Sequence, residues 1–329
     1  MKFLRNKDGD VVHLKATDAM PEAVHVLDER SIQAVNAALA ARRPLLVRGE
    51  PGIGKSQLAR AAAKELGRAY VHRVVDSRTE SRDLLWHFDA VERLAEAQLR
   101  GALGDDRKTV KKELKVANYL HPGPLWWAFH WEGAEPQAKK VGRPPPPQWD
   151  GGRYTEGCLA LIDEIDKAES DVPNGLLEAL GAGTFTPQGC DSPVKVEGIA
   201  PLVMITTNEE RALPDAFVRR CLVLHLELPA LPEEREAFQD LLVDRGRAHF
   251  ADAADILLTE AARLLVDYRV ESLQLHRLPL PGQAEYLDLM RAVITLGDTP
   301  ERQEELLSEI ARYTVRKHAE DGAADAARR

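Results

Sequence analysis

The residues best suited to chemistry form one short stretch near position 50. The phosphate-loop positions, which we expect to contact nucleotide together with Gln57, are Gly49, Glu50, Pro51, Gly52, Ile53, Gly54, Lys55 and Ser56. The spacing Gly-x-x-x-x-Gly-Lys-Ser, after an apolar run and before a helical pattern, is typical of a loop that cradles phosphate groups. Backbone N–H groups and a helix N-terminus attract phosphate oxygens there. We expect Lys55 to reach the β- and γ-phosphates and the Ser56 hydroxyl to ligate Mg²⁺.

Two adjacent carboxylates follow a second apolar run. Residues 159–162 read Leu-Ala-Leu-Ile, and Asp163 and Glu164 come next. A buried strand would carry both acids to its end, where Asp163 supports Mg²⁺ and Glu164 polarises an attacking water as general base. Paired acids at a strand end can also be ordinary solvated turn residues. In a chain that also carries the phosphate loop, they predict hydrolysis of a nucleoside triphosphate.

An amide and two arginines complete the candidate set. Asn208 ends a further apolar run and can hydrogen-bond the attacking water and the γ-phosphate, although an Asn can also simply close a turn. Residues 213–221 read Leu-Pro-Asp-Ala-Phe-Val-Arg-Arg-Cys, with Arg219 directed away from the apolar helix face and Arg220 at the helix end. An arginine supplied to a neighbouring subunit's γ-phosphate stabilises the charge of the transition state. The alternative is a pair of surface salt bridges.

These candidates need a sheet and its helices to bring them together. Short apolar runs predict buried parallel strands at residues 45–47, 70–75, 158–162, 202–206 and 222–226. Helical patterns lie between them at residues 57–66, 169–180 and 213–220, so the class is α/β. From residue 233 to about 318 the patterns are helical, without a clear strand. We therefore predict a nucleotide-binding αβα domain over residues 1–228, a helical lid over 229–320 and a flexible tail over 321–329.

Composition narrows the function classes. The chain has 329 residues, of which 44% are apolar and 29% charged, as in a folded globular protein. Lys and Arg number 44 and Asp and Glu 53, so the net charge of −9 argues against broad binding to nucleic acid or anionic membranes. No apolar run is long enough to span a membrane. Three separated cysteines and a start without an apolar signal region predict a cytoplasmic protein.

Several segments fall outside this core pattern. Residues 77–120 are an insertion whose basic stretch, 107–115, reads as a solvated helix face, with nucleic-acid contact as the alternative. Residues 135–152 are predicted to be a Pro-rich surface loop. Clustered tryptophans at 126, 127 and 131 favour core packing over substrate gripping. The histidines at 87, 121 and 130 show no ligand spacing, which argues against a bound transition metal.

The phosphate loop, strand-end acids, Asn208 and arginine pair resemble, in order and spacing, those of AAA+ ATPases. More narrowly, residues 22–228 are similar to the MoxR-like branch. The supporting motifs are His-Pro-Gly-Pro-Leu-Trp at 121–126, Asp-Glu-Ile-Asp-Lys-Ala at 163–168, Leu-Leu-Glu-Ala-Leu at 176–180, and Leu-Pro-Asp-Ala at 213–216 followed by Arg220-Cys221. The insertion at 77–120 departs from the family because it is longer and more charged.

The resemblance implies a sheet order of 5-1-4-3-2, with ATP and Mg²⁺ bound against a neighbouring subunit of a ring, expected to be a hexamer. Arg220 is then the finger, with Arg219 in reserve, and Arg277 is the nucleotide-contacting residue of the lid unless Gln283 holds that position. The resemblance also implies remodelling or maturation of a protein client, with a von Willebrand factor A domain protein as a partner. The alternatives are a nucleotide-gated scaffold of low turnover, as in a defence complex, and a DNA-acting ring.

Overall fold

The computed structural model describes residues 2–18, 22–103 and 107–316. The chain forms two compact units, the first made of Met1–Gly49 and Lys55–His225 and the second of Glu50–Gly54 and Leu226–Arg329. The long segment of the second unit begins at Leu226, whereas the sequence predicts the domain boundary after residue 228. The predicted tail, 321–329, lies outside the described residues.

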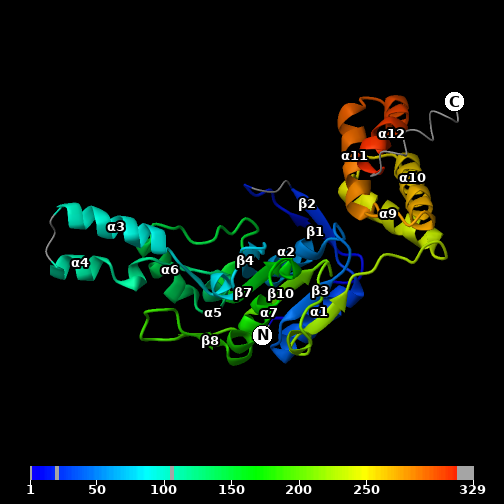
Figure 1. The fold of residues 1–329 in the computed structure, drawn as a ribbon. Coiled ribbons are helices and arrows are strands. Elements are labelled where there is room, and N and C mark those ends of the chain that lie inside the picture. Colours follow the sequence, from blue (N-terminus) through cyan, green and yellow to red (C-terminus); the bar gives the residue numbers. More distant parts are fainter. Residues whose placement is uncertain (1, 19–21, 104–106, 317–329) are drawn as a thin grey trace. The chain divides into compact units, whose positions relative to one another are not determined.

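The first unit is built on a five-stranded sheet (Figure 1). Its strands are β3 (Leu45–Arg48), β4 (Arg68–Val74), β7 (Arg153–Asp163), β10 (Leu202–Thr207) and β11 (Leu222–His225). They lie in the order β11-β3-β10-β7-β4 with every pairing parallel, which confirms the predicted order 5-1-4-3-2. Thr207 pairs with Arg48, and Val74 pairs with Asp163. The carboxyl ends of the strands therefore meet at one edge, where the predicted site residues follow them.

Successive side chains along each strand point to opposite faces of the sheet, and both faces are covered by apolar layers. On one face, Leu46, Ile162 and Ile205 join a core that includes residues of α5 (Pro124–Phe129) and α7 (Asp171–Ala182). The intervening residues Leu45 and Leu161 are also fully buried, and α2 (Lys55–Leu66) packs against β4, β7 and β10. Burial on both faces accounts for the continuous apolar runs in the strands. The αβα fold class predicted from the sequence is thus confirmed.

Smaller elements complete the first unit. They are β1 (Val11–Leu14) paired with β2 (Ala23–Val26), α1 (Glu29–Ala41), η3 (Ile165–Lys167), β8 (Thr184–Phe185) paired with β9 (Val194–Lys195), and α8 (Asp215–Val218). The side chain of Asp28 caps α1 by accepting from the Ser31 backbone N–H. The helix predicted over 213–220 is shorter than expected, and α8 forms only a single turn at Asp215–Val218. Within this turn Ala216 is exposed, whereas Phe217 is fully buried.

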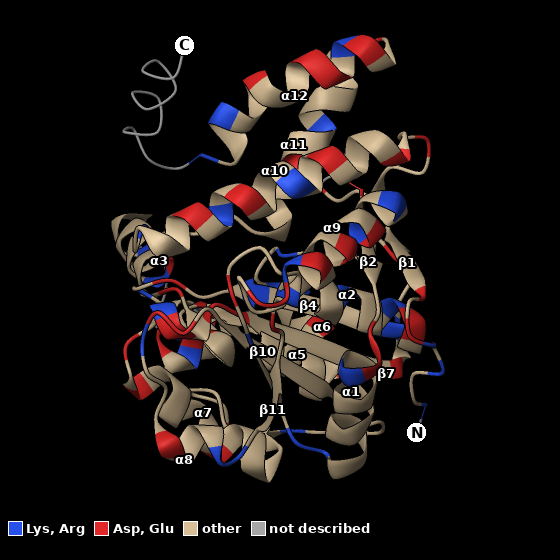
Figure 2. Ribbon diagram, turned by 90° about the vertical axis from the view of Figure 1, so that its right-hand side faces the viewer, with Lys and Arg blue, Asp and Glu red and all other residues tan. Residues whose placement is uncertain are grey.

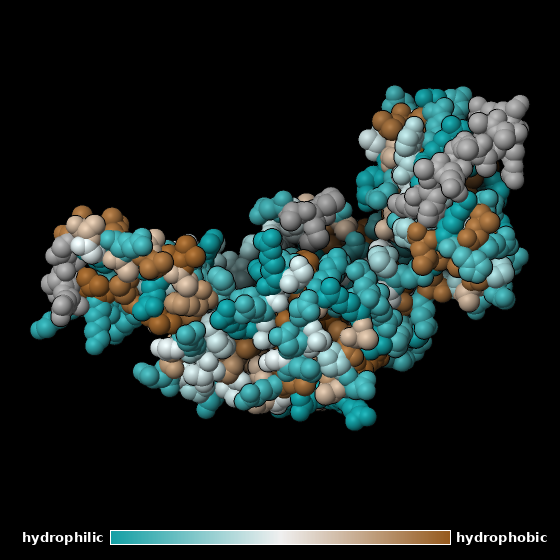
Figure 3. Space-filling view, viewed as in Figure 1, coloured by the Kyte–Doolittle hydropathy of each residue, from teal (hydrophilic) through white to brown (hydrophobic). Residues whose placement is uncertain are grey.

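The insertion leaves the sheet after β4 and returns before α5. Its elements are η1 (Ser81–Leu84), β5 (Trp86–Phe88), α3 (Ala90–Leu103), α4 (Arg107–Glu113), η2 (Val116–Asn118) and β6 (Leu120–Pro122). Strands β5 and β6 pair antiparallel and carry α3 and α4 away from the sheet (Figure 1). Lysines 108, 111, 112 and 115 are exposed, as predicted for a solvated helix face. Apolar residues of α3, Val91 and Leu103 among them, are exposed as well, and brown patches mark this insertion in Figure 3.

One prediction for the following segment was wrong. Residues 135–140 belong to α6 (Trp131–Lys140) and are not part of a loop, although the helix contains Pro136. The side chain of Gln137 donates to the carbonyls of Ala117 and Leu120, which ties α6 to the end of the insertion. Trp126 and Trp127 are buried in the core, and Trp131 packs against it. The prediction of a packing role for the tryptophans is therefore confirmed.

The second unit contains four helices among the described residues. They are α9 (Arg235–His249), α10 (Asp255–Gln274), α11 (Gln283–Leu296) and α12 (Pro300–Thr314). Phe238, Leu265 and Tyr286 are fully buried in its apolar core. Thr299 caps α12 by accepting from the Arg302 backbone N–H. Acidic and basic residues are interspersed along α10 and α12 (Figure 2). None of the described helices combines the length and apolar character that a membrane span needs.

Candidate functional site

The phosphate loop connects β3 to α2, and two of its glycines adopt conformations that other residues rarely adopt. Gly52 and Gly54 have φ values of +78° and +99°, which favour glycine because a Cβ atom would be strained there. Helix α2 begins at Lys55. The Lys55 side chain is 6% exposed, and its Nζ donates to the Gly49 carbonyl at 2.7 Å and to Asn208 Oδ1 at 2.6 Å. Burial lowers the pKa of Lys55, and the nearby carboxylates of Asp163, Asp166, Glu164 and Glu209 oppose that shift.

Ser56 and Asp163 meet although they come from different elements. The Ser56 hydroxyl, in the first turn of α2, contacts Asp163 Oδ2 at 2.7 Å and Oδ1 at 2.9 Å at the end of β7. One hydroxyl beside one carboxylate is an oxygen donor set of the kind that Mg²⁺ prefers. The structure thus brings together the two residues predicted to hold the metal. Their binding of Mg²⁺ stays a prediction.

Thr206 on β10 links both acids, and sequence reasoning missed it. It is fully buried, its hydroxyl donates to Asp163 Oδ1, and its oxygen accepts from the Glu164 backbone N–H at 2.9 Å. A buried hydroxyl needs partners, and these bonds set the position of the Asp163 carboxylate and the backbone of Glu164. The available signal was a threonine at the carboxyl end of an otherwise apolar strand.

Glu164 contacts both Asn208 and a lysine. It adopts a left-handed conformation with φ +60°, directly after β7. Its Oε1 accepts from Asn208 Nδ2 at 3.3 Å, and its Oε2 lies 3.0 Å from Lys167 Nζ. The hydrogen bond that Lys167 donates to Glu164 raises the pKa of Lys167. Asn208 therefore contacts Lys55 through its amide oxygen and Glu164 through its amide nitrogen.

Asp166 holds the turn that carries Asn208, and it too was missed as a site residue. It is 2% exposed and accepts from the backbone N–H groups of Asn208 at 3.4 Å and Glu210 at 2.9 Å. These bonds connect the segment after β7 to the segment after β10. Asp166 belongs to the Asp-Glu-Ile-Asp run, but the run alone does not show which acid faces which backbone.

The arginine pair follows α8, and a third arginine holds its backbone. Arg219 and Arg220 are exposed. Arg43, after α1, donates from Nε to the Arg220 carbonyl at 3.1 Å and from Nη2 to the Cys221 carbonyl at 3.4 Å, with a further bond to the Arg219 carbonyl. Exposed arginine side chains are able to contact another molecule. The finger role of Arg220 or Arg219 stays a prediction, and Arg43 is a positioning residue that the sequence did not reveal.

The residues predicted in the lid lie in the second unit. Arg277 follows α10, and Gln283 begins α11 with 9% exposure. Contact of either residue with nucleotide stays a prediction. A different arginine of this unit, Arg269, is 5% exposed, and its Nη2 lies 2.6 and 2.8 Å from the two carboxylate oxygens of Glu50. Its Nη1 donates to the Pro281 carbonyl at 2.7 Å. The sequence signal that could have indicated it is an arginine at a position that the helical pattern assigns to the apolar face of α10.

Comparison with known proteins places this geometry in a family. Residues 44–221 match the model of the AAA domain, dynein-related subfamily. No curated protein matches the chain. Among solved structures, a Cytophaga hutchinsonii protein to which ATPase activity is attributed is 14% identical, with 89% of this chain and 83% of that chain covered. The TM-score between the two structures is 0.37.

The matched range contains each of the residues that meet at the sheet edge, from Lys55 and Ser56 to Asp163, Glu164 and Asn208. It also extends over more than half of the 329 residues. The match to this family agrees with the geometry of the phosphate loop, which lies inside the matched range. The chain therefore belongs to the AAA domain family, in its dynein-related subfamily.

Proposed function

We propose that the chain is a cytoplasmic, MoxR-like ATPase that hydrolyses ATP to ADP and phosphate and uses the reaction to remodel a protein partner. The observation that carries the hydrolytic part is the contact of Asn208 with both Lys55 and Glu164. One amide thereby connects the residue expected to hold the γ-phosphate with the residue expected to activate water. A site that only bound nucleotide would not require that connection.

Each side chain has a distinct role in the proposed reaction. Lys55 binds the β- and γ-phosphates and offsets their charge, and Asn208 senses the γ-phosphate. Glu164 accepts a proton from the attacking water as general base. Ser56 and Asp163 would hold Mg²⁺, which neutralises charge that develops on the phosphates when it is bound. Thr206 keeps the Asp163 carboxylate in place.

The active form that we propose is a ring, with six subunits as the simplest case. An arginine finger stabilises transition-state charge when a neighbouring subunit supplies it, and the exposed pair Arg219 and Arg220 suits this task. Arg43 donates hydrogen bonds to the backbone carbonyls of both arginines, which limits movement of the segment. Arg220 is the first candidate because the MoxR-like motif aligns with it.

The proposed client is a protein, with a von Willebrand factor A domain protein as a partner. Support comes from the MoxR-like motifs at residues 121–126, 163–168 and 176–180, which lie within the matched AAA domain. The net charge of −9 disfavours nucleic acid as the client. A client should stimulate turnover, whereas a partner of a nucleotide-gated scaffold should bind without changing it.

Replacement of the general base tests the hydrolytic part. We expect Glu164→Gln to lower kcat by about 10²- to 10⁴-fold while ATP still binds, because the amide keeps the shape of the side chain but cannot accept the proton. Phosphate release and binding of a fluorescent ATP analogue measure the two properties. Glu169→Gln is the matched control, since this acid lies near Glu164 in the chain and is exposed.

Two results would decide against the proposal. Steady-state turnover of Glu164→Gln at the wild-type rate would exclude the base role. A wild-type protein that binds ATP, assembles and shows no turnover above background would instead indicate the nucleotide-gated scaffold. Light scattering with and without ATP measures the assembly in the same samples.

A further inference from the structure

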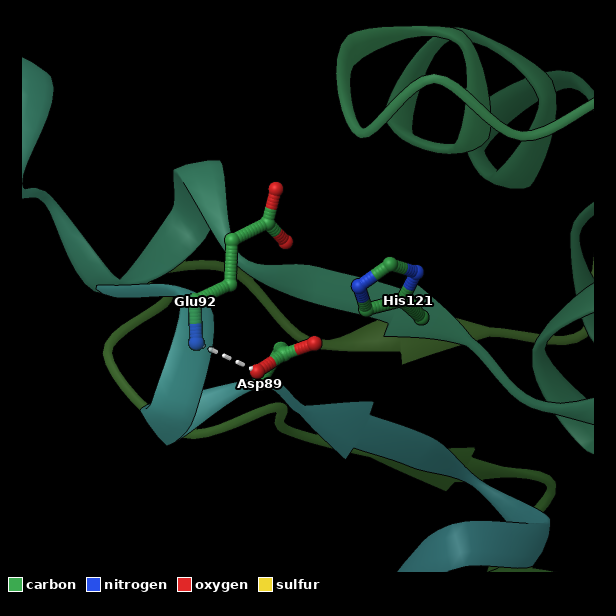
Figure 4. Close-up of side chains that lie close together, drawn as sticks. All are labelled: Asp89, Glu92 and His121. Atoms are coloured by element: carbon green, nitrogen blue, oxygen red, sulfur yellow. Dashed lines mark hydrogen bonds between the residues drawn. The ribbon is translucent and has the colours of Figure 1, made fainter. Parts of the chain in front are cut away.

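A second cluster of ligand-type side chains lies in the insertion of the first unit. Asp89 follows β5, Glu92 lies in the first turn of α3, and His121 lies on β6. One ligand atom from each of the three lies within 4.8 Å of the other two. Figure 4 shows the imidazole edge of His121 turned toward both carboxylates. Chain spacing gave no sign of this cluster, because the β5–β6 pairing and the start of α3 bring His121 to the two acids.

The backbone holds two of these side chains in place. Asp89 Oδ1 accepts from the Glu92 N–H at 2.7 Å, so this carboxylate caps α3 and keeps its other oxygen for a further contact. His121 is fixed by strand pairing opposite His87. Glu92 is exposed and able to change rotamer. Two ligands of one tetrahedral ion lie roughly 3.3 Å apart, given bonds of about 2.0 Å, so a small rotation of Glu92 closes the site.

A polar atom at this place lacks a partner. His121 Nε2 is buried and has no hydrogen bond to any described residue. A buried polar atom without a partner costs free energy unless a water or an ion satisfies it. Asp89 and His121 also line a cavity of about 560 Å³, together with His72, Arg73 and His87. The cluster therefore has space beside it for further ligands.

We propose that Asp89, Glu92 and His121 form a binding site for a divalent transition-metal ion such as Zn²⁺. One imidazole nitrogen and two carboxylate oxygens are ligands of the type that Zn²⁺ uses, and the two negative charges offset that of the ion. Three protein ligands leave a fourth position open toward the cavity. Bound metal would connect the first turn of α3 to β6 and so stiffen the base of the insertion. This site is independent of the proposed ATP hydrolysis.

Calorimetry on the tag-free full chain tests the proposal. The protein is stripped with a chelator and titrated with Zn²⁺ in a large excess of Mg²⁺, which fills oxygen-only sites such as that of Ser56 and Asp163. We expect one site per chain, and its affinity should fall at least about 10-fold in Asp89→Asn and in His121→Gln. Asn preserves the helix cap, so Asp89→Asn removes the charge with little effect on folding.

His87→Gln is the matched control, because His87 faces the same cavity and pairs with His121 but is not in the cluster. We expect it to bind Zn²⁺ like the wild type. Co²⁺ absorption gives a second readout, since loss of the imidazole ligand should shift the d–d bands in His121→Gln. The proposal is overturned if the wild type binds no Zn²⁺, if Asp89→Asn and His121→Gln keep wild-type affinity, or if His87→Gln alone loses binding.

Discussion

Lys55 and Asn208 are joined by a 2.6 Å hydrogen bond from Nζ to Oδ1, although 153 positions separate them in the chain. The adjacency of β3 and β10 makes this contact, since each residue lies beyond the carboxyl end of one of these strands. Because Asn208 also contacts Glu164, a phosphate that draws Lys55 away would change the environment of the general base. The amide can thus couple occupation of the site to the activation of water.

Removal of that amide should separate binding from turnover. We expect Asn208→Ala to lower kcat by about 10²-fold, the usual cost of losing one hydrogen-bond donor to the transition state, with a smaller change in the Kd for ATP. Phosphate release and nucleotide titration measure the two quantities. Asn174→Ala, at an exposed position of α7, should behave as wild type. A wild-type kcat in Asn208→Ala would refute the coupling.

Thr206→Val tests the support of the two acids. Valine has a similar shape but no hydroxyl, so the Asp163 carboxylate and the Glu164 N–H each lose a partner. We expect the free energy of unfolding to fall by about 1–3 kcal/mol and kcat to fall as well. Denaturant unfolding and phosphate release measure these effects. Thr207→Val is the control, since Thr207 is equally buried but accepts from the Glu209 N–H. Equal kcat values in the two variants would count against a special role for Thr206.

Subunit mixing tests the arginine finger. Arg220→Ala should lower kcat by about 10³-fold or more, and Arg219→Ala should do so much less. Mixing Arg220→Ala with Glu164→Gln should restore turnover, because intact Glu164 from one subunit then meets intact Arg220 from another. Phosphate release from the mixture gives the answer. If the mixture is no more active than its components, the arginine does not act between subunits.

Buried thiols predict how stability changes with pH. Burial raises the pKa of Cys158 to about 12 and that of Cys221 to about 11, because a thiolate is poorly solvated in the core. The unfolded chain ionises these thiols near pH 8.5, so the folded state binds more protons above that pH. The free energy of unfolding should therefore be unaffected below about pH 8 and decline as the pH rises toward 11.

Denaturant unfolding at a series of pH values measures this decline, and Cys158→Ala should reduce its slope. At about pH 8, alkylation followed by mass spectrometry should modify Cys190, which is partly exposed, well before Cys158 and Cys221. Rapid labelling of Cys158 in the native protein would show that the thiol is not held in the core. An unchanged slope in Cys158→Ala would assign the decline to other groups.

The sequence by itself determined the αβα class, the five core strands and the phosphate loop. These features depend on local patterns, namely apolar runs of strand length and glycines at fixed spacing, which short segments encode without reference to the rest of the chain. Local patterns failed at α6, because residues 135–140 were included in the Pro-rich surface loop predicted over 135–152. There the bonds from Gln137 and the packing of Trp131 favour the helix.

Only the tertiary structure decided which polar groups support the site. Thr206, Asp166 and Arg43 act through contacts with residues 42 to 178 positions away. The approach of His121 to Asp89 and Glu92 likewise depends on the pairing of β5 with β6. Hydrogen bonds and metal ligation require particular atoms within a few ångströms, and strand order, register and helix position set those distances. The sequence therefore indicates which residues can do chemistry, and the fold selects those that do it together.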